Sequence, residues 1–272
     1  MTEAPPLDPI DAGALISESF AGTSGSRLPK HVRLYDAVAA QIDTGHLTAA
    51  RKLPGERDLC DATGLSLGTV QKALGMLVTD GRIVREHGRG TFVRGDRRPL
   101  TEMWHYRFRD PATGTHLPVY ATLAGREHVA AGSPWSDALG PDDAGYVRIT
   151  RVVSIAGRFR CWSEMHLPFH RFGGLMRLPR ADIESINLKQ LLAAKFAAPT
   201  LATTQTVIIR SFPNDVAEAI GTEPGTPGLL LSITGASRGG VPITFQRIHV
   251  PQSDCELEIG VDAVSSITAA AA

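Results

Sequence analysis

The sequence predicts an α+β protein of two domains, the first helical with a short β-hairpin and the second rich in β-strands. Three observations predict this fold class. Apolar residues recur at helical spacing between residues 33 and 79, and strand-like apolar runs follow between residues 147 and 250. A polar, charged stretch near residues 95–101 separates the two patterns. At 272 residues and 43% apolar composition, the chain is long enough for two cores.

Two helices are predicted first. One covers about residues 33–44, where four-residue steps form an apolar stripe of Leu34, Val38 and Ile42. Gly45 is expected to end it. A second, short helix opens within residues 53–59, with Pro54 near its first turn and acidic residues where the helix dipole favours negative charge. It is expected to end near Gly64.

A third helix and a hairpin complete the first domain. Ser66 is placed to cap the helix, whose inward face is expected to hold Leu67, Val70, Leu74 and Leu77. Two helices joined by a tight glycine turn form a helix-turn-helix. Residues 82–85 and 91–93 are expected to pair as a hairpin with a basic tip at residues 87–90. This order of elements predicts a winged helix-turn-helix that binds DNA.

The second half is expected to form an antiparallel sheet with helices packed on it. Strands are predicted at residues 147–155, 161–167, 203–212, 228–237 and 242–250. Turns at residues 156–158 and 239–241 would join neighbours as hairpins. Helical patterns alternate with the strands at residues 125–131, 188–195 and 215–220.

Charge is unevenly distributed along the chain. Residues 1–26 carry four acidic side chains and no basic one, residues 27–98 carry 13 Lys or Arg against 8 Asp or Glu, and residues 99–272 carry 15 against 16. The positive charge therefore lies on the predicted DNA-binding module. The nearly neutral second half favours a sensor or assembly domain.

Several function classes are not expected. The chain shows no signal-peptide pattern and no apolar run long enough to span a bilayer, which predicts a cytoplasmic protein without a membrane partner. Cys60, Cys161 and Cys255 are far apart and lack C-x-x-C spacing, so reduced, buried thiols are expected. No nucleophile with its base, cofactor loop or metal-ligand spacing is recognisable, so we expect no catalytic residue, cofactor or metal.

Residues 34–93 resemble the DNA-binding domain of the GntR family of bacterial regulators. The resemblance rests on residues at the family's spacing across one continuous segment: Leu53-Pro54, Glu56-Arg57, Leu59, Gly64, Ser66, Thr69-Val70, Ala73-Leu74, Leu77, Gly81 and Gly88-Arg89-Gly90-Thr91-Phe92-Val93. The chain departs from the family at Leu67 and Gln71, which stand where it commonly places two arginines that contact DNA. We therefore expect a different operator preference.

The recognition helix of such a domain enters the major groove, where its side chains read base edges. Thr69, Gln71 and Lys72 are the candidate readers: Gln suits adenine, Thr suits the thymine methyl group, and Lys suits a guanine or a phosphate. By resemblance, Arg57 reaches the DNA from the second helix. Arg89 of the wing is implied to enter or border the minor groove.

Other residues of the module have supporting or alternative roles. Ser66 is primarily a cap, with a phosphate contact as its second candidate role, and Gly88 and Gly90 flank the tip arginine. The basic tail of Arg94, Arg97 and Arg98 is expected to add phosphate contacts. Each residue also has a plain structural alternative, as a solvated charge or a hairpin glycine, but a complete winged helix favours the DNA role.

The second half, from about residue 107 to residue 258, resembles the UTRA effector-binding domain that marks the HutC-type branch of the family. The motifs are Arg148-Ile149-Thr150-Arg151, Gly157, Glu164-Met165-His166-Leu167-Pro168, Ala217 to Gly221, Gly225 to Leu231 and Gly240-Val241-Pro242-Ile243. The resemblance implies a pocket between the sheet and its covering segments, in which Arg151 and Glu164 are opposite charges that orient a polar ligand. A structural ion pair is the alternative. Val153 stands where many members carry a second Arg, which argues against an anionic effector.

The function expected is that of a sequence-specific transcriptional regulator and, by resemblance, a repressor. It would bind a palindromic operator in double-stranded DNA as a homodimer, under the control of a small-molecule effector. An enzyme is not expected. Two alternatives stay open: a lyase-like activity, because the UTRA fold resembles that of chorismate lyase, or a C-terminal domain that binds no effector.

The predicted organisation is a flexible leader (1–30), the winged helix-turn-helix domain (31–95), a linker (96–104), the UTRA effector-binding and dimerisation domain (105–260) and a tail (261–272). The leader is rich in proline and poor in apolar residues. A short docking helix is its alternative, built on Ile10, Leu15, Ile16 and Phe20.

Overall fold

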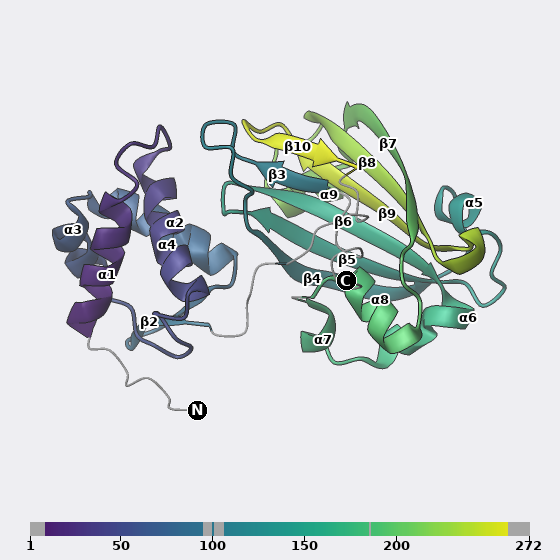
Figure 1. Ribbon diagram of the computed structural model, residues 1–272, viewed down its shortest axis with the longest axis horizontal. Helices are drawn as coiled ribbons and strands as arrows, with labels where there is room; N and C mark the ends of the chain where they lie inside the picture. The colour runs from purple at the N-terminus through teal and green to yellow at the C-terminus, as the bar shows by residue number, and fades with distance from the viewer. Residues whose placement is uncertain (1–8, 95–99, 101–105, 185, 261–272) are drawn as a thin grey trace, which may run out of the picture. The chain divides into compact units, whose positions relative to one another are not determined.

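The computed structural model in Figure 1 describes residues 9–94, 100, 106–184 and 186–260. The chain divides into two compact units, the first of residues 1–98 with 156–158 and the second of residues 99–155 with 159–272. Helices dominate the first unit and antiparallel strands the second, which confirms the predicted α+β class. The predicted tail at 261–272 and most of the predicted linker lie outside the described residues.

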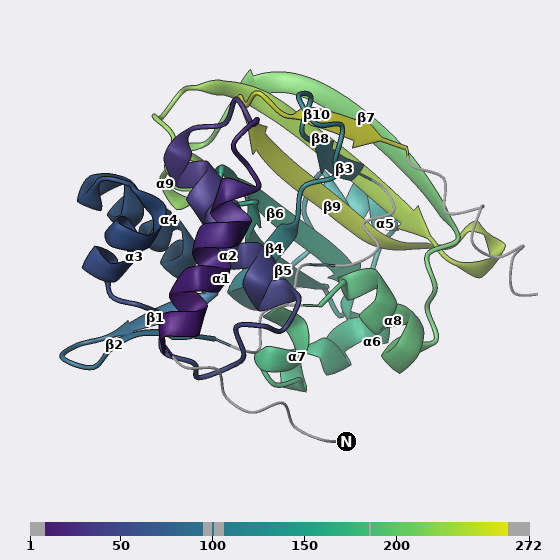
Figure 2. The same cartoon turned by 60° about the vertical axis from the view of Figure 1, so that its left-hand side comes forward.

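The first unit consists, in its described residues, of helices and one hairpin: α1 (Pro9–Ala21), α2 (Lys30–Asp43), α3 (Glu56–Thr63), α4 (Leu67–Thr79), β1 (Ile83–Glu86) and β2 (Gly90–Val93). Figure 2 shows the β1–β2 hairpin extending from the helices. Its core includes Leu34, Val38, Leu59, Leu74 and Leu77, all nearly inaccessible to solvent. The predicted helices and hairpin are confirmed, although Leu67 is 44% exposed and does not face inward.

Helix α1 contradicts the predicted flexible leader over residues 9–21. Ala12, Ile16 and Phe20 recur at four-residue steps and are buried, and α1 packs against α2 and α3. The Ser17 hydroxyl donates to the Ala62 carbonyl at 2.6 Å. The docking-helix alternative is therefore correct, because a stripe of apolar side chains on one face is enough to bury a helix whose other faces are polar.

A buried cation connects the hairpin to α2. The Arg82 side chain is fully buried, lies 2.6 Å from Asp43 and donates to the Ala39 carbonyl at 2.8 Å. Nearby, the Tyr35 hydroxyl donates to Asp80 at 2.5 Å. Because a buried charge requires a partner, removing Asp43 would destabilise the point where the wing begins. Arg82 therefore belongs to the fold and not to the surface that could meet DNA.

The second unit is built on a six-stranded antiparallel sheet in the order β4-β5-β6-β9-β8-β7. Its strands are β4 (Val119–Val129), β5 (Tyr146–Ile155), β6 (Phe159–Pro168), β7 (Ala202–Ser211), β8 (Pro227–Ala236) and β9 (Pro242–Pro251). A separate ribbon pairs β3 (Tyr106–Arg109) with β10 (Glu256–Ile259). Its helical segments are α5 (Trp135–Leu139), α6 (Phe169–Phe172), η1 (Gly173–Arg177), α7 (Ala181–Glu184), α8 (Leu188–Phe196), α9 (Asn214–Ile220) and η2 (Arg238–Gly240).

All five predicted strands are confirmed, as β5 to β9, and so are the helices at 188–195 and 215–220. The helix predicted at residues 125–131 is wrong, because most of that segment continues β4 and pairs with β5 along its length. A bulge between Leu123 and Gly125 shifts the register there and disturbs the alternation of apolar residues that marks a strand. The strands β3 and β10, of four residues each, were not predicted.

Cross-strand pairing defines two faces of the sheet, because residues directly opposite one another in antiparallel strands share a face. We call one the cavity face; it carries Val207, Leu231, Ile248, Ser163 and Arg151. We call the other the histidine face; it carries Ser232, Arg247, Glu164 and Thr150, with His166 and His249 two residues along their strands.

Different segments cover the two faces. On the cavity face, apolar residues of α6, η1, α7 and α8 form one core with Val147, Ile149, Met165 and Leu167 of the sheet. On the histidine face, Trp135 of α5 stacks on His166 with ring centroids 4.4 Å apart. Next to α9, Phe212 contacts His249 edge-on at 5.4 Å.

Candidate DNA interface and effector site

Helix α4 presents a solvent face that suits a groove. Ser66 caps it as predicted, with the Thr69 N–H donating to the Ser66 hydroxyl at 3.4 Å. Gln71 and Lys72 are exposed on this face, while Thr69 is half-buried near the cap. Since Leu67 is also exposed, the first turn offers an apolar side chain where an arginine would offer a charge.

Gln71 is held by a contact that the sequence did not predict. Its side-chain amide donates to Glu56 of α3 at 2.8 Å, and the other Glu56 oxygen accepts from Arg85 of β1 at 3.0 Å. One carboxylate thus joins the recognition helix, the preceding helix and the wing. Glu56 orients a candidate reader, and Arg85 is an exposed cation beside it. Arg57, the neighbour of Glu56 on α3, is exposed.

The wing places its tip arginine in solvent. Arg89 is 74% exposed and lies 2.5 Å from Glu86 across the turn. Gly88 and Gly90 have φ of +73° and +118°, a region that disfavours side chains. A Cβ on Gly90 would approach within 2.7 Å of Lys52 Cε, so the Lys52 side chain lies beside the wing at Gly90. Lys52 was not predicted as part of this surface; Arg97 and Arg98 lie outside the described residues.

The sequence predicts that Arg151 and Glu164 face one pocket as opposite charges, and the structure contradicts this. Arg151 lies opposite Ser163, and Glu164 lies opposite Thr150, so the two charged side chains point to opposite faces of the sheet. The residue opposite Arg151 is thus one position away from Glu164, and successive side chains of a strand point to opposite faces of the sheet. Arg148 stands three residues before Arg151, so it points to the other side of the sheet and shares the histidine face with Glu164.

Arg151 is buried on the cavity face. Its guanidinium donates to the Ile186 carbonyl at 2.9 Å. Burial lowers its pKa to about 10, and Tyr106 acts in the opposite direction. A backbone carbonyl satisfies one of its donors without neutralising the charge. The positive charge of Arg151 is therefore not neutralised by this hydrogen bond, and a polar group of a ligand could still interact with it.

Glu164 belongs to a network on the histidine face. Its carboxylate lies 4.0 Å from Arg148 and 3.3 Å from the Nε2 atom of His166, and Arg148 lies 2.5 Å from Glu127. Burial raises the pKa of Glu164, while Arg148 and Arg247 lower it. The alternative expectation, a structural ion pair of Arg151 with Glu164, is therefore also wrong, because the arginine nearest to Glu164 is Arg148.

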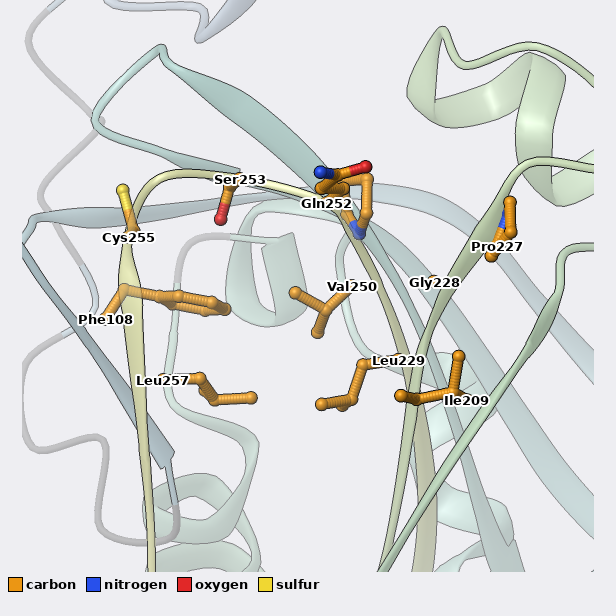
Figure 3. A pocket seen from close by; sticks show the side chains of 11 residues that line it. Phe108, Ile209, Pro227, Gly228, Leu229, Val250, Gln252, Ser253, Cys255 and Leu257 are labelled. Carbon is orange, nitrogen blue, oxygen red and sulfur yellow. The ribbon is translucent and has the colours of Figure 1, made fainter.

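A cavity of about 370 Å³ lies between the β3–β10 ribbon and the cavity face (Figure 3). Ile209, Leu229 and Val250 stand directly opposite one another on β7, β8 and β9 and form its floor. Phe108 and Leu257, paired across the ribbon, form the facing wall. The polar side chains in its lining are Gln252, Ser253 and Cys255. The volume lies within the range of roughly 300–1,000 Å³ typical of small-molecule sites.

Cys161 is buried, whereas Cys60 and Cys255 are half-buried, so the expected burial is confirmed for one of the three cysteines. No cluster of three or more His, Cys, Asp or Glu side chains suited to a metal ion occurs in the parts described. None of the helices placed by the structure is long and apolar enough to cross a membrane.

Comparison with known proteins agrees with this geometry. Residues 30–93 match the family described as bacterial regulatory proteins, gntR family, and residues 121–255 match the UTRA domain. The repressor NagR of Bacillus subtilis is 28% identical, over 79% of this chain and 87% of its own length. The regulator Rv0792c of Mycobacterium tuberculosis is 44% identical over 70 residues, which span only 26% of each protein.

Solved structures show the same fold for the second unit. The ligand-binding domain of a protein assigned to the GntR-family regulators, from Bordetella bronchiseptica, superposes with a TM-score of 0.51 at 18% identity, covering 57% of this chain and 96% of that one. The two domain matches follow one another in the order of the two units. The chain belongs to the GntR family of transcriptional regulators and combines its DNA-binding winged helix-turn-helix with the UTRA domain typical of the HutC-type branch.

Proposed function

We propose that the chain is a homodimeric repressor that binds a palindromic operator and is controlled by an effector bound in its UTRA domain. The observation that carries the proposal is the joined surface of α3, α4 and the wing, where Glu56 holds both Gln71 and Arg85. NagR, which matches most of the chain, is named a repressor. The UTRA unit is proposed to bind its ligand without converting it, in a cytoplasmic protein.

The DNA contacts follow from exposure and position. In this proposal α4 lies in the major groove, where Thr69, Gln71 and Lys72 read base edges or meet phosphates. The Ser66 hydroxyl, already engaged by its cap, stays a secondary phosphate contact. Arg57 supplies a phosphate contact from α3.

The wing contributes through its shape and its charge. Gly88 and Gly90 allow the tight tip that carries Arg89 toward the minor groove. Lys52 and Arg94, both exposed, extend the positive surface beyond the residues expected from sequence.

The dimer is proposed to form along β7, the edge of the sheet. Val207, Ile208 and Ile209 are 46%, 57% and 76% exposed, so consecutive apolar side chains point to both sides of a strand whose outer edge has no neighbour among the described strands. Such an edge is prone to pair with another strand, and two copies of one strand are self-complementary about a twofold axis. Ile208→Lys is expected to yield monomers in light scattering, whereas Thr206→Lys on the same face is expected to have a smaller effect.

The effector is proposed to bind on the cavity face. Arg151 shares that face and remains a candidate effector contact. Glu164 is not retained as its partner, because it lies on the histidine face. An effector that favours one arrangement of the dimer would change the spacing of the recognition helices and so the affinity for the operator.

The test is a salt titration on an operator selected from random DNA. Wild type, Arg57→Ala, Arg89→Ala and the control Arg177→Ala, an exposed arginine of the second unit, are compared by fluorescence anisotropy. Each of the two DNA-domain variants is expected to reduce the slope of log affinity against log salt by about 1, and the control to leave it unchanged. Failure to select any sequence, or equal slopes in all four proteins, would refute the proposed function.

A further inference from the structure

We propose that the effector is an uncharged, largely hydrocarbon or aromatic molecule held in the cavity between the β3–β10 ribbon and the sheet. The inference rests on the proposed function and adds the chemical class of the ligand. It is carried by the composition of the cavity walls, by the residue that stands at position 153 and by the position of the polar groups.

The cavity walls hold no charged side chain among the described residues that line them. Arg151 shares this face of the sheet but is not part of the lining, so the inference leaves Arg151 outside the effector site. Phe108 and Val250 are buried, and Leu229 and Leu257 are half-buried, so both the floor and the facing wall are apolar. A charged ligand would lose its hydration there and find no opposite charge. An apolar ligand would gain free energy in proportion to the area it buries.

Val153 continues this apolar surface. It lies opposite Cys161 on the cavity face and is 2% exposed. The pair Val153 and Cys161 lies two residues along the strands from the pair Arg151 and Ser163. In the same way, the pair Leu229 and Val250 lies two residues along from the pair Leu231 and Ile248. The side chain that replaces a second arginine is therefore in the same row of the sheet as the floor of the cavity, and it adds no positive charge.

The polar groups of the lining lie together at one end. In Figure 3, Gln252 and Ser253 lie along the segment that leads from β9 to β10, while the carbon side chains lie below them. An amide and a hydroxyl are neutral donors and acceptors, which suit a hydroxyl, carbonyl or amide group of the ligand. The ligand class inferred is thus an apolar body with one neutral polar end.

The experiment compares two fluorescent ligands with the same aromatic body, 2-naphthol, which is neutral, and 2-naphthyl phosphate, which is an anion. We expect 2-naphthol to bind the full-length protein at least about tenfold more tightly, because the phosphate cannot be paired in the cavity. Leu229→Trp is expected to fill the cavity and weaken 2-naphthol binding by at least about tenfold. The matched control is Leu201→Trp, which alters a 60% exposed leucine outside the lining.

If Leu229→Trp fails to fold, Leu257→Trp blocks the same space from the ribbon. Tighter or equal binding of the phosphate ester would overturn the inference, and so would unchanged 2-naphthol binding in both cavity variants. Operator anisotropy with each ligand separates this from the proposed function. If only the phosphate ester released the DNA, the inferred ligand class would be wrong and the proposed function as an effector-controlled regulator would be supported. Binding of 2-naphthol that is lost in Leu229→Trp, without any effect on DNA, would support the cavity and refute effector control.

Discussion

Acidification from about pH 7 to about pH 5 should destabilise the second unit through two buried histidines. His166 and His249 are 0% and 2% exposed, and none of their ring nitrogens makes a hydrogen bond among the described residues, although the Glu164 carboxylate lies 3.3 Å from His166 Nε2. Burial lowers the pKa of each from 6.5 to about 4; Arg148 and Arg247 add to the effect at His166, and Arg247 and Arg210 at His249, where Asp215 opposes them.

The magnitude follows from the difference between the two states. The unfolded chain takes up these protons near pH 6.5, whereas the folded chain takes them up only near pH 4. Stability is therefore greatest above the unfolded pKa and falls as the pH drops through this window. At pH 5 the cost is about 2 kcal/mol for each histidine, and about 4 kcal/mol for both. The raised pKa of Glu164 on the same face acts in the opposite direction and offsets part of this loss.

The assay is urea unfolding at several pH values, followed by tryptophan fluorescence, since Trp135 stacks on His166. The double variant His166→Phe, His249→Phe retains aromatic rings and removes the titrating nitrogens, so its unfolding free energy should vary much less with pH. His87→Phe, in the exposed wing, is the matched control and should behave as wild type. An equal loss of stability on acidification in the double variant would refute the reasoning.

Three further predictions concern single side chains. Glu56→Gln should strengthen operator binding by roughly 0.5–1 kcal/mol at low salt, because it removes a negative charge beside Arg85, and anisotropy would detect it; unchanged affinity would place Glu56 away from the DNA. Gly90→Ala should cost roughly 1–3 kcal/mol in thermal unfolding and weaken DNA binding, because a side chain is strained at its φ of +118°. Gly88→Ala should cost less, because φ is +73° there, nearer the left-handed region that other residues enter, and the reverse order would contradict this. Lys189→Met should raise stability by roughly 1–4 kcal/mol, because the buried amine has no hydrogen-bond partner among the described residues and burial lowers its pKa from 10.5 to about 7. In urea unfolding, wild-type stability should then rise between those two pKa values while the variant stays flat, and a loss of stability in Lys189→Met would show that the amine has a partner.

Elements whose signal lies within one segment could be predicted from the order of residues alone. The apolar spacing of α2, the Ser66 cap, the glycines of the wing and the strands β5 to β9 all depend on neighbouring residues, so the order of residues along the chain was sufficient. The position of Arg89 at the tip of the wing follows from the same local pattern.

Which segments meet, and in what register, became known from the three-dimensional packing and not from the residue pattern. One residue of register separates the expected pairing of Arg151 with Glu164 from the observed pairing with Ser163, and nothing within either strand specifies it. Long-range packing likewise turned α1 into part of the first core, buried Arg82 against Asp43 and brought the β3–β10 ribbon over the cavity. The physical reason is that periodicity records which side of a segment is apolar, while the partner of that side is set by the balance of contacts over the whole fold.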